Sequence, residues 1–270
     1  MYKLKYVILN LDMDSMLIND VMDISLQAGV LILENGGETY RAEETCVNVA
    51  KSLGATDASA FVTPTVVIVT VTDKDHKAHT AMQRITNRTV NLRKISQVNN
   101  LTRRLSLRGK RTNLSQAENL LAKIRQAPGH SKGKLLWMAG FSAFFFSLMF
   151  GGNWKEAITA FVIGMILRIE LIFLEKFHLN SFILSVISGG LISILCELVI
   201  VIGIVPATIT VMTAVLMQVV PGMAIVNAIR DLIAGDLIAG TDRLVDSFMV
   251  SAGLSVGSVF GVLVFSHVLG

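Results

Sequence analysis

The sequence predicts a small α+β domain over residues 1–134, followed by an all-α transmembrane bundle of five helices over residues 135–270. Hydrophobic residues make up 52% of the chain and charged residues only 16%, whereas a soluble domain has about a quarter charged residues. Residues 1–134 carry 31 charged side chains and residues 135–270 carry 13. With a mean hydropathy of +0.60, the composition excludes a disordered chain, a collagen-like repeat and a disulfide-framed secreted domain.

The first half alternates between the helical and the extended period. Apolar residues at helical spacing predict helices over 17–33 and 42–53, interrupted by Gly36 and Gly37. The β-branched run 66–71 predicts a strand, with a second strand over 78–85 and a third over 89–95. From Lys94 the helical period returns, and Ser115 to Glu118 matches a capping box at the start of one more helix.

The stretch 84–134 is strongly basic, with 13 lysines and arginines and one acidic residue, Glu118. Such a stretch fits either nucleic acid or anionic lipid headgroups. No aromatic side chain interleaves the charges to stack on bases, and an apolar run follows directly. We therefore expect a basic surface against the lipid bilayer and no nucleic-acid partner, with the first domain in the cytoplasm.

Five apolar spans are predicted in the second half, since about 20 residues cross the hydrocarbon layer. Arg168 and Glu170 fall in the last turns of the second span, where we expect them to be interfacial. The segment 227–243 would connect the last two spans on the cytoplasmic side, and five spans place the C-terminus outside. The spans cover residues 135–150, 154–174, 181–202, 204–226 and 244–268.

Rows of small residues mark two helix faces that pack closely in lipid. Gly253, Gly257 and Gly261 recur at every fourth position, which indicates either a compact bundle or a face for a partner. A second row, Ser185 to Ser193, is continued by Glu197. A carboxylate there is either part of a proton pathway or a hydrogen-bonded structural group.

No catalytic or metal centre is predicted. Gly253 to Gly257 matches the G-x-S-x-G pattern, but a nucleophile elbow needs a strand, a turn and a helix, and this match lies inside a continuous apolar helix. The two cysteines have no zinc spacing. We expect no enzyme activity, no metal and no cofactor.

The segment 221–246 combines a helix break with charged residues. Pro221 and Gly222 interrupt a helix, and polar residues follow among apolar ones. Broken helices with polar ends are where transporters build solute and ion sites. An ordinary loop is the alternative, although the regular apolar content argues against a freely solvated one. The polar residues are Asn227, Arg230, Asp231, Asp236 and Asp242.

This segment resembles the signature of the threonine/serine exporter family. The match is carried by Pro221, Gly222, Arg230, Asp231, Gly235, Asp236, Gly240 and Arg243. A second stretch, residues 28–45, is similar to the cytoplasmic motif of the family and contains Glu38, Thr39, Arg41 and Glu44. A weaker third match is Gly151 to Trp154.

The resemblance implies a proton-coupled secondary exporter in a bacterial plasma membrane, for threonine and serine or for dicarboxylates such as succinate. Some members carry ten spans, so this chain resembles the large subunit of a split form that works with a second small membrane subunit. Homo-oligomers are a further possibility. From the helix break and the carboxylate within a span, we expect the substrate or ion pathway to include Glu197, Pro221, Gly222, Asn227, Arg230, Asp231 and Asp236.

Several roles stay open at this point. Arg230 could hold a substrate carboxylate with two hydrogen bonds or form a salt bridge to a neighbouring acid. The residues Glu38, Thr39, Arg41 and Glu44 could line a cytoplasmic vestibule or cap and stitch the domain. The alternative function is a membrane-anchored enzyme or sensor acting through residues 1–134, although no nucleotide loop, metal cluster or catalytic triad spacing occurs there.

Overall fold

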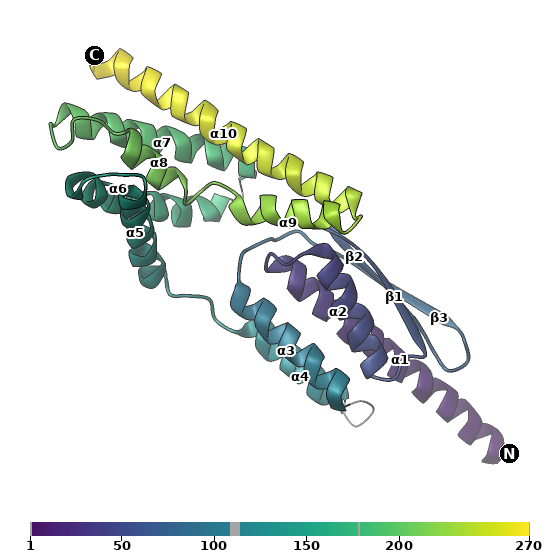
Figure 1. Ribbon diagram of the computed structural model, residues 1–270. Coiled ribbons are helices and arrows are strands. Elements are labelled where there is room, and N and C mark those ends of the chain that lie inside the picture. Colours follow the sequence, from purple (N-terminus) through teal and green to yellow (C-terminus); the bar gives the residue numbers. More distant parts are fainter. Residues whose placement is uncertain (1, 109–113, 178, 270) are drawn as a thin grey trace. The chain divides into compact units, whose positions relative to one another are not determined.

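The chain forms two compact units in the computed structural model (Figure 1), which describes residues 2–108, 114–177 and 179–269, and the side chains of 17–107, 114–177 and 179–267. The first unit comprises Met1–Gly129 with Met223–Leu244, and the second comprises His130–Gly222 with Val245–Gly270. The segment that carries the charged 221–246 motif thus belongs mainly to the same unit as the N-terminal residues.

The first unit is an α+β domain with helices packed on one face of a small sheet. Its three strands are antiparallel in the order β1-β2-β3. Val67, Val69 and Val71 of β2 are fully buried, because alternate side chains of a strand point to the same face. Its elements are α1 (Tyr2–Glu34), α2 (Thr39–Ser52), β1 (Asp57–Thr63), β2 (Val66–Thr72), β3 (Ala78–Arg84), α3 (Leu92–Arg108), α4 (Leu114–Gln126), α9 (Gly222–Ile233) and the start of α10 (Leu237–Leu269).

Two strand predictions need correction. The strand β1 was not predicted, since Asp57–Thr63 is poor in β-branched residues. It pairs with β2 along its whole length, from Asp57 opposite Thr72 to Thr63 opposite Val66, and this pairing fixes it as a strand. The predicted strand 89–95 is wrong. Thr89 N instead donates to Glu34 O at 2.8 Å and Asn91 N to Asn35 O at 3.0 Å, so the segment is tied to the end of α1 and α3 begins at Leu92.

The prediction of a capping box that begins at Ser115 is also wrong. Helix α4 begins at Leu114, so Ser115 lies inside the helix and is not the N-cap. The residue before the helix falls among residues 109–113, as does part of the basic stretch 84–134, and these lie outside the described residues.

The second unit consists of helices. They are α5 (Lys132–Met149), α6 (Trp154–Leu174), the short 3-10 helix η2 (Glu175–Phe177), α7 (Ser181–Val201), α8 (Ile209–Leu216) and the remainder of α10. Asn153 caps α6 by accepting from Lys155 N and Glu156 N, and the Glu156 side chain accepts from Asn153 N in return. The buried residues of α5, α6, α7 and α8 form one apolar cluster.

Three helices within the described residues are long and apolar enough to cross a membrane: Trp154–Phe177, Ser181–Val201 and Leu237–His267. The predicted count of five spanning helices is therefore not confirmed. The predicted span 135–150 is a helix of 18 residues, α5, but begins with two lysines. The predicted span 204–226 is not continuous, because α8 is only 8 residues long and ends before Pro221.

The segment 227–243 is not a loop. It forms most of α9 and the first turns of α10, joined by a turn at Gly235, where φ is +91°. A glycine adopts this left-handed conformation without the steric cost of a Cβ atom. The amphipathic content noted in the sequence therefore reflects a helical hairpin.

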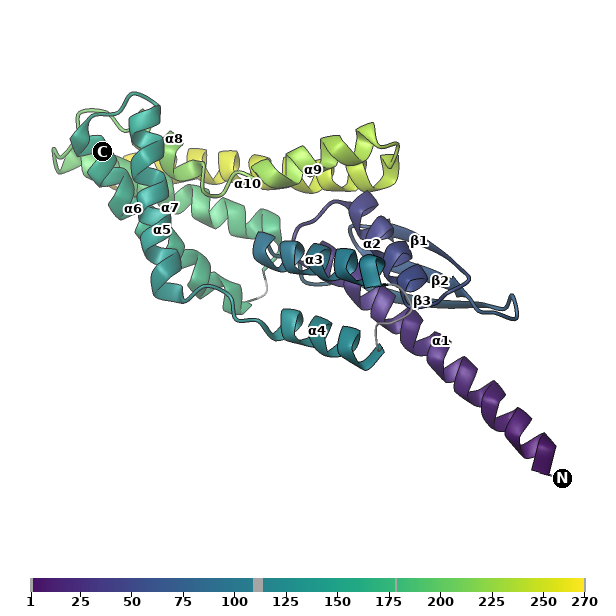
Figure 2. The same ribbon diagram turned by 60° about the horizontal axis from the view of Figure 1, so that its bottom comes forward.

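The glycine row of α10 packs against α7 (Figure 2), and the two helices run parallel there. A Cβ atom on Gly253 would lie 2.8 Å from Phe182 O, and one on Gly261 would lie 2.6 Å from Gly190 O. A Cβ on Gly257 would collide with Val186 O. This row is therefore covered within the chain and is not a free face for a partner.

Candidate functional site: a contact between two motifs

The end of α1 and the start of α2 create a compact turn of backbone polar groups. Gly36 has φ +87°, and Gly36 N and Gly37 N donate to Leu33 O and Ile32 O at 3.0 and 2.9 Å. This arrangement closes α1 with a left-handed glycine, as helix C-termini commonly do. Glu38 is then the N-cap of α2 without a side-chain cap hydrogen bond, so the free amides of α2 remain available to other partners.

Three side chains of α9 bond to this turn, and one of them accepts from the first amide of α2. Asn227 Nδ2 donates to Gly36 O at 2.9 Å, and the Arg230 guanidinium donates to Glu38 Oε1 at 2.7 Å. Asp231 Oδ1 accepts from Thr39 N at 3.2 Å. A carboxylate at a helix N-terminus is favoured by both the free N–H groups and the helix dipole, so Asp231 caps α2 from a helix nearly 200 residues away in sequence.

Arg243 of α10 completes the contact. Its Nε lies 3.1 Å from Asp231 Oδ2, and its terminal nitrogen donates to Gly37 O at 2.8 Å. The approach of α9 and α10 depends on Gly240, because a Cβ there would lie 2.6 Å from Leu232 Cγ and 2.9 Å from Ala228 O. The segments 28–45 and 221–246, which carry the family resemblance, are thus in direct contact.

The charges in this contact differ in how far they are buried. Asp231 is fully buried and Arg243 is 10% exposed, whereas the Arg230 side chain is 56% exposed and Glu38 is 7% exposed. Burial raises the pKa of Asp231, and the hydrogen bonds from Thr39 and the charge of Arg243 oppose this only in part. The inner pair is therefore enclosed, while Arg230 still faces solvent.

The pKa values of two glutamates at the start of α2 shift in opposite directions. Burial of Glu38 acts to raise its pKa, but its own backbone hydrogen bond, Arg230 and Arg41 outweigh this and lower the pKa overall. The pKa of Glu43 is raised by burial first and then by the charges of Asp236 and Asp231, although Val62 N donates to Glu43 Oε1 at 2.9 Å. Glu43 was not among the predicted site residues, and only its position within the motif of residues 28–45 could have indicated it.

The remaining predicted residues are dispersed. Arg41 lies 3.5 Å from the second Glu38 oxygen, and Glu44 is exposed. Pro221 and Gly222 mark the start of α9, and Asp236 directly precedes α10, with one carboxylate oxygen buried. Glu197 lies near the end of α7 in the second unit, so it is not part of the contact around Asp231.

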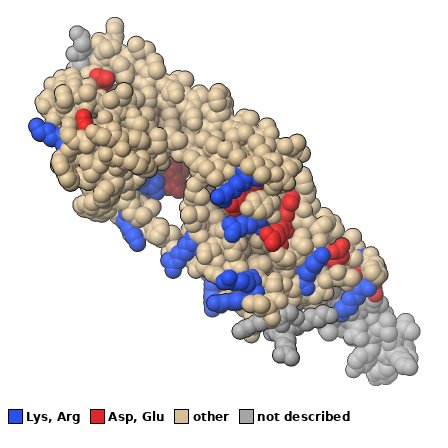
Figure 3. All heavy atoms as spheres, in the orientation of Figure 1, with Lys and Arg blue, Asp and Glu red and all other residues tan. Residues whose placement is uncertain are grey.

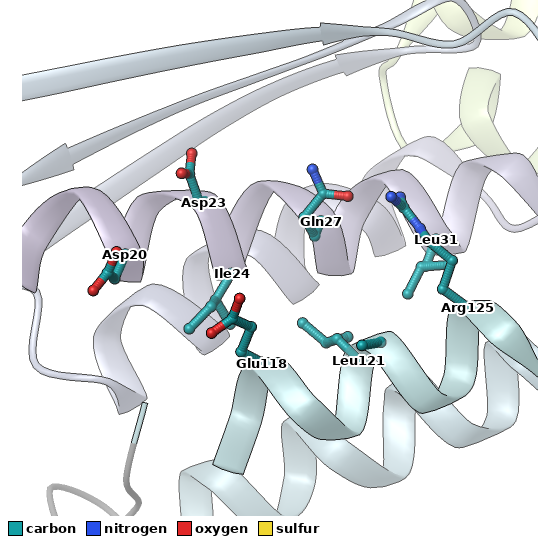
Figure 4. A pocket seen from close by; sticks show the side chains of 9 residues that line it. Asp20, Asp23, Ile24, Gln27, Leu31, Glu118, Leu121 and Arg125 are labelled. Atoms are coloured by element: carbon teal, nitrogen blue, oxygen red, sulfur yellow. The ribbon is translucent and has the colours of Figure 1, made fainter. Parts of the chain in front are cut away.

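Charged atoms gather on the first unit and are few on the visible face of the second (Figure 3). A cavity of about 250 Å³ lies between α1 and α4 (Figure 4). Asp20 and Glu118 lie toward one end and Arg125 toward the other, while Asp23 points away from α4. None of the predicted site residues lines this cavity. Among the described residues, no group of three His, Cys, Asp or Glu side chains could hold a metal ion.

Comparisons with known proteins give consistent results. The family model described as "Putative threonine/serine exporter" matches residues 23–265. The chain is 24% identical over 241 residues to a "Probable threonine/serine exporter" of Mycobacterium tuberculosis, covering 88% of this chain and 45% of that protein.

Two enterobacterial relatives are matched over nearly their whole length. The chain is 21% identical to the "Probable succinate transporter subunit YjjP" of Klebsiella aerogenes, covering 90% of this chain and 93% of the relative. It is 20% identical to the protein of the same name in Escherichia coli, covering 91% and 94%. No solved structure matches the chain.

The matched region contains both motifs, two of the three candidate membrane spans completely and all but the last two residues of the third. The family acts in transport and not in enzyme catalysis, which sets aside the alternative of a membrane-anchored enzyme. The chain belongs to the threonine/serine exporter family of membrane transporters.

Proposed function

We propose that the protein is one subunit of a secondary exporter for small polar metabolites that carry a carboxylate, either threonine and serine or dicarboxylates such as succinate. The observation that carries this is the family match over residues 23–265, together with relatives whose names refer to both solute classes. A carboxylate is the chemical group that these solutes share.

We further propose a second, small membrane subunit as the partner. The chain spans about half the length of the Mycobacterium relative but almost the full length of the two relatives named as transporter subunits. A chain of this size would then supply part of a pathway and need a separate protein for the rest. A second copy of this chain is the alternative partner.

The proposed location is a bacterial plasma membrane with the first unit in the cytoplasm. The excess of lysine and arginine before α5 supports this orientation, because positive charge is retained on the cytoplasmic side. Proton coupling is part of the proposal, with Glu197 as a candidate carrier because ionisable side chains within membrane helices commonly belong to such pathways.

Arg230 is the residue of the motif contact that is best placed to meet a solute. Its side chain is 56% exposed and its guanidinium is bonded to Glu38, while Asn227 and Asp231 are buried and already bonded to the turn at residues 36–39. A solute carboxylate at the cytoplasmic entrance would therefore compete with Glu38 for Arg230, since guanidinium binds carboxylates in a bidentate manner.

The test measures uptake of labelled threonine, serine and succinate into everted membrane vesicles from the native host, with the chromosomal gene deleted or replaced by variants. We expect deletion to abolish uptake of at least one solute. Arg230→Gln should weaken apparent affinity, while Glu38→Gln, which frees Arg230, should strengthen it. Equal uptake with and without the gene for all three solutes would refute the proposed function.

A further inference from the structure

A groove on the surface of the first unit lies between α2 and α3, two helices that pack against each other (Figure 1). Its volume is about 430 Å³. One lining residue, Arg41, belongs to α2, and the others come from a single stretch of α3. These are Leu92, Ile95, Ser96, Asn99, Asn100 and Arg103. The groove is therefore built entirely within the first unit.

The lining residues of α3 form one stripe along that helix. They recur at every third or fourth position, and residues at this spacing share one side of a helix. The stripe begins apolar, with Ile95 buried in the core of the first unit, and then carries a hydroxyl, two amides and a guanidinium group. A helix face that packs against its own domain is ordinarily apolar. The polar part of the stripe is thus not explained by packing.

The polar groups of the groove are mainly hydrogen-bond donors. Arg103 Nη2 donates to Asn100 Oδ1 at 2.8 Å, which holds the guanidinium over the preceding turn of α3. Since the oxygen of Asn100 accepts this bond, its Nδ2 group is the part that is left to donate. A guanidinium group donates and never accepts. The groove therefore suits a ligand that is rich in acceptor oxygens.

The charge of the groove is positive. None of the described residues that line it is acidic. Glu38 Oε2 lies 3.5 Å from Arg41, whose side chain is 44% exposed, but Glu38 Oε1 accepts from Arg230 at 2.7 Å. One carboxylate is thus shared between two guanidinium groups. The helix α3 itself contains five lysines and arginines and no acidic residue. A cluster of charges of one sign raises the local concentration of the opposite ion.

We propose that the groove between α2 and α3 binds a phosphate monoester or free phosphate, which Arg41 and Arg103 hold by charge-assisted hydrogen bonds. Guanidinium groups bind phosphate oxygens in a bidentate manner. A phosphoryl group offers three acceptor oxygens and carries about 1.5 to 2 negative charges at neutral pH, so it uses more of these donors than a single carboxylate does. Two sources supply this chemistry: the headgroup of a lipid such as phosphatidic acid, and a phosphate free in solution. The groove is separate from the solute contact proposed at Arg230.

The first arm of the experiment titrates the purified full-length chain in an uncharged detergent with inorganic phosphate at constant ionic strength. A ligand that binds the folded chain raises its thermal midpoint. We expect Arg41→Gln and Arg103→Gln each to need about tenfold more phosphate for the wild-type rise, because charge-assisted hydrogen bonds are the strong ones. Arg93→Gln and Arg104→Gln remove the same charge from exposed positions of α3 outside the groove and should keep the wild-type rise.

The second arm places the same variants in nanodiscs of pure phosphatidylcholine or of an equal mixture of phosphatidylcholine and phosphatidic acid. A rise with phosphatidic acid that depends on Arg41 and Arg103 identifies a lipid headgroup as the source, whereas dependence in the first arm alone identifies a free phosphate. Each rise is measured against the same variant without phosphate, so a change in basal stability does not imitate a loss of binding.

A further variant separates charge from geometry. Arg103→Lys keeps the charge but loses the planar fork of donors, so it should keep only part of the rise. The inference would be overturned by the absence of a rise in the wild type in both arms, or by equal rises in the Arg41→Gln/Arg103→Gln and Arg93→Gln/Arg104→Gln double variants in both arms. A larger groove-dependent rise with succinate than with phosphate would also overturn it, and would leave the proposed exporter function standing.

Discussion

The motif contact in the first unit is held by charged and polar side chains, whereas α7 and α10 in the second unit are held by the close approach of small residues. Asp231 accepts from Thr39 N and lies 3.1 Å from Arg243 Nε. In the second unit, a Cβ atom on Gly257 would collide with Val186 O. The first contact therefore depends on ion pairs and hydrogen bonds, and the second on steric fit.

The difference also separates family resemblance from chemistry. The two most characteristic sequence motifs meet each other, so their polar atoms are largely used in joining α2 to α9 and α10. Arg230, whose side chain is more than half exposed, is the member of the contact that is open to solvent. We infer that the buried part of the two motifs builds the transporter and that Arg230, at its edge, meets the solute.

The largest effect is expected from removing the enclosed carboxylate of the motif contact. Asp231→Ala removes the carboxylate that lies beside Arg243 Nε and accepts from the first amide of α2, and removing one member of a buried ion pair costs about 3–5 kcal/mol. Denaturant unfolding of the purified chain in detergent should show this loss. Asp242→Ala, at an exposed acid of the same hairpin, serves as the control; equal unfolding of the two variants would contradict a structural role for Asp231.

The membrane unit should depend more on close helix packing than on ion pairs. Gly257→Ala places a methyl group against the backbone of Val186, and overpacking of this kind costs about 1–3 kcal/mol. Gly190→Ala is the matched control, because the nearest atom to its Cβ, Gly257 O, lies at 3.4 Å. The measurement is the thermal midpoint in detergent, and a lower midpoint for Gly190→Ala than for Gly257→Ala would contradict the packing described.

A smaller effect is expected at the exposed edge of the motif contact. Exchanging the charges of Glu38 and Arg230 in the double variant should change the unfolding free energy by no more than about 1 kcal/mol, because Arg230 is more than half exposed and screened by solvent. Each single charge reversal should be worse than the double. If the double variant lost more unfolding free energy than the two single variants lose together, the expectation that the two charges act as a pair would be contradicted.

The smallest expected effect is on the pH dependence of stability. Burial raises the folded-state pKa of Glu43, so the folded protein binds this proton more tightly than the unfolded chain does. The stability contributed by this group is complete below its ordinary value of 4.5 and is lost as pH rises through the folded-state pKa. Thermal midpoints should therefore fall less with rising pH in Glu43→Gln than in the wild type, while Glu44→Gln, at an exposed neighbour, should retain the wild-type slope.

Local periodicity predicted much of the first unit but not the pairing of its parts. The alternation over Val66–Val71 and the helical spacing over 17–33 identified β2 and the buried part of α1. β1 escaped prediction because its formation depends on the edge of β2 and not on its own residues. The predicted strand 89–95 failed because backbone bonds to Glu34 and Asn35, distant in sequence, fix that segment.

The residues of the candidate site could likewise be predicted, but their contacts could not. The sequence identified Asn227, Arg230 and Asp231 as important, and left open whether Arg230 meets a solute or an acid; the structure pairs it with Glu38. The meeting of residues 36–39 with α9 could not be predicted, because it joins segments about 190 residues apart.

The most direct test of this division between structure and solute binding is the shift in thermal midpoint that the transported solute, threonine, serine or succinate, induces in the purified chain. We predict that Asp231→Ala lowers the midpoint itself but keeps the solute-induced rise, whereas Arg230→Gln changes the midpoint little and reduces the rise. A rise that persists in Arg230→Gln and disappears in Asp231→Ala would contradict the account.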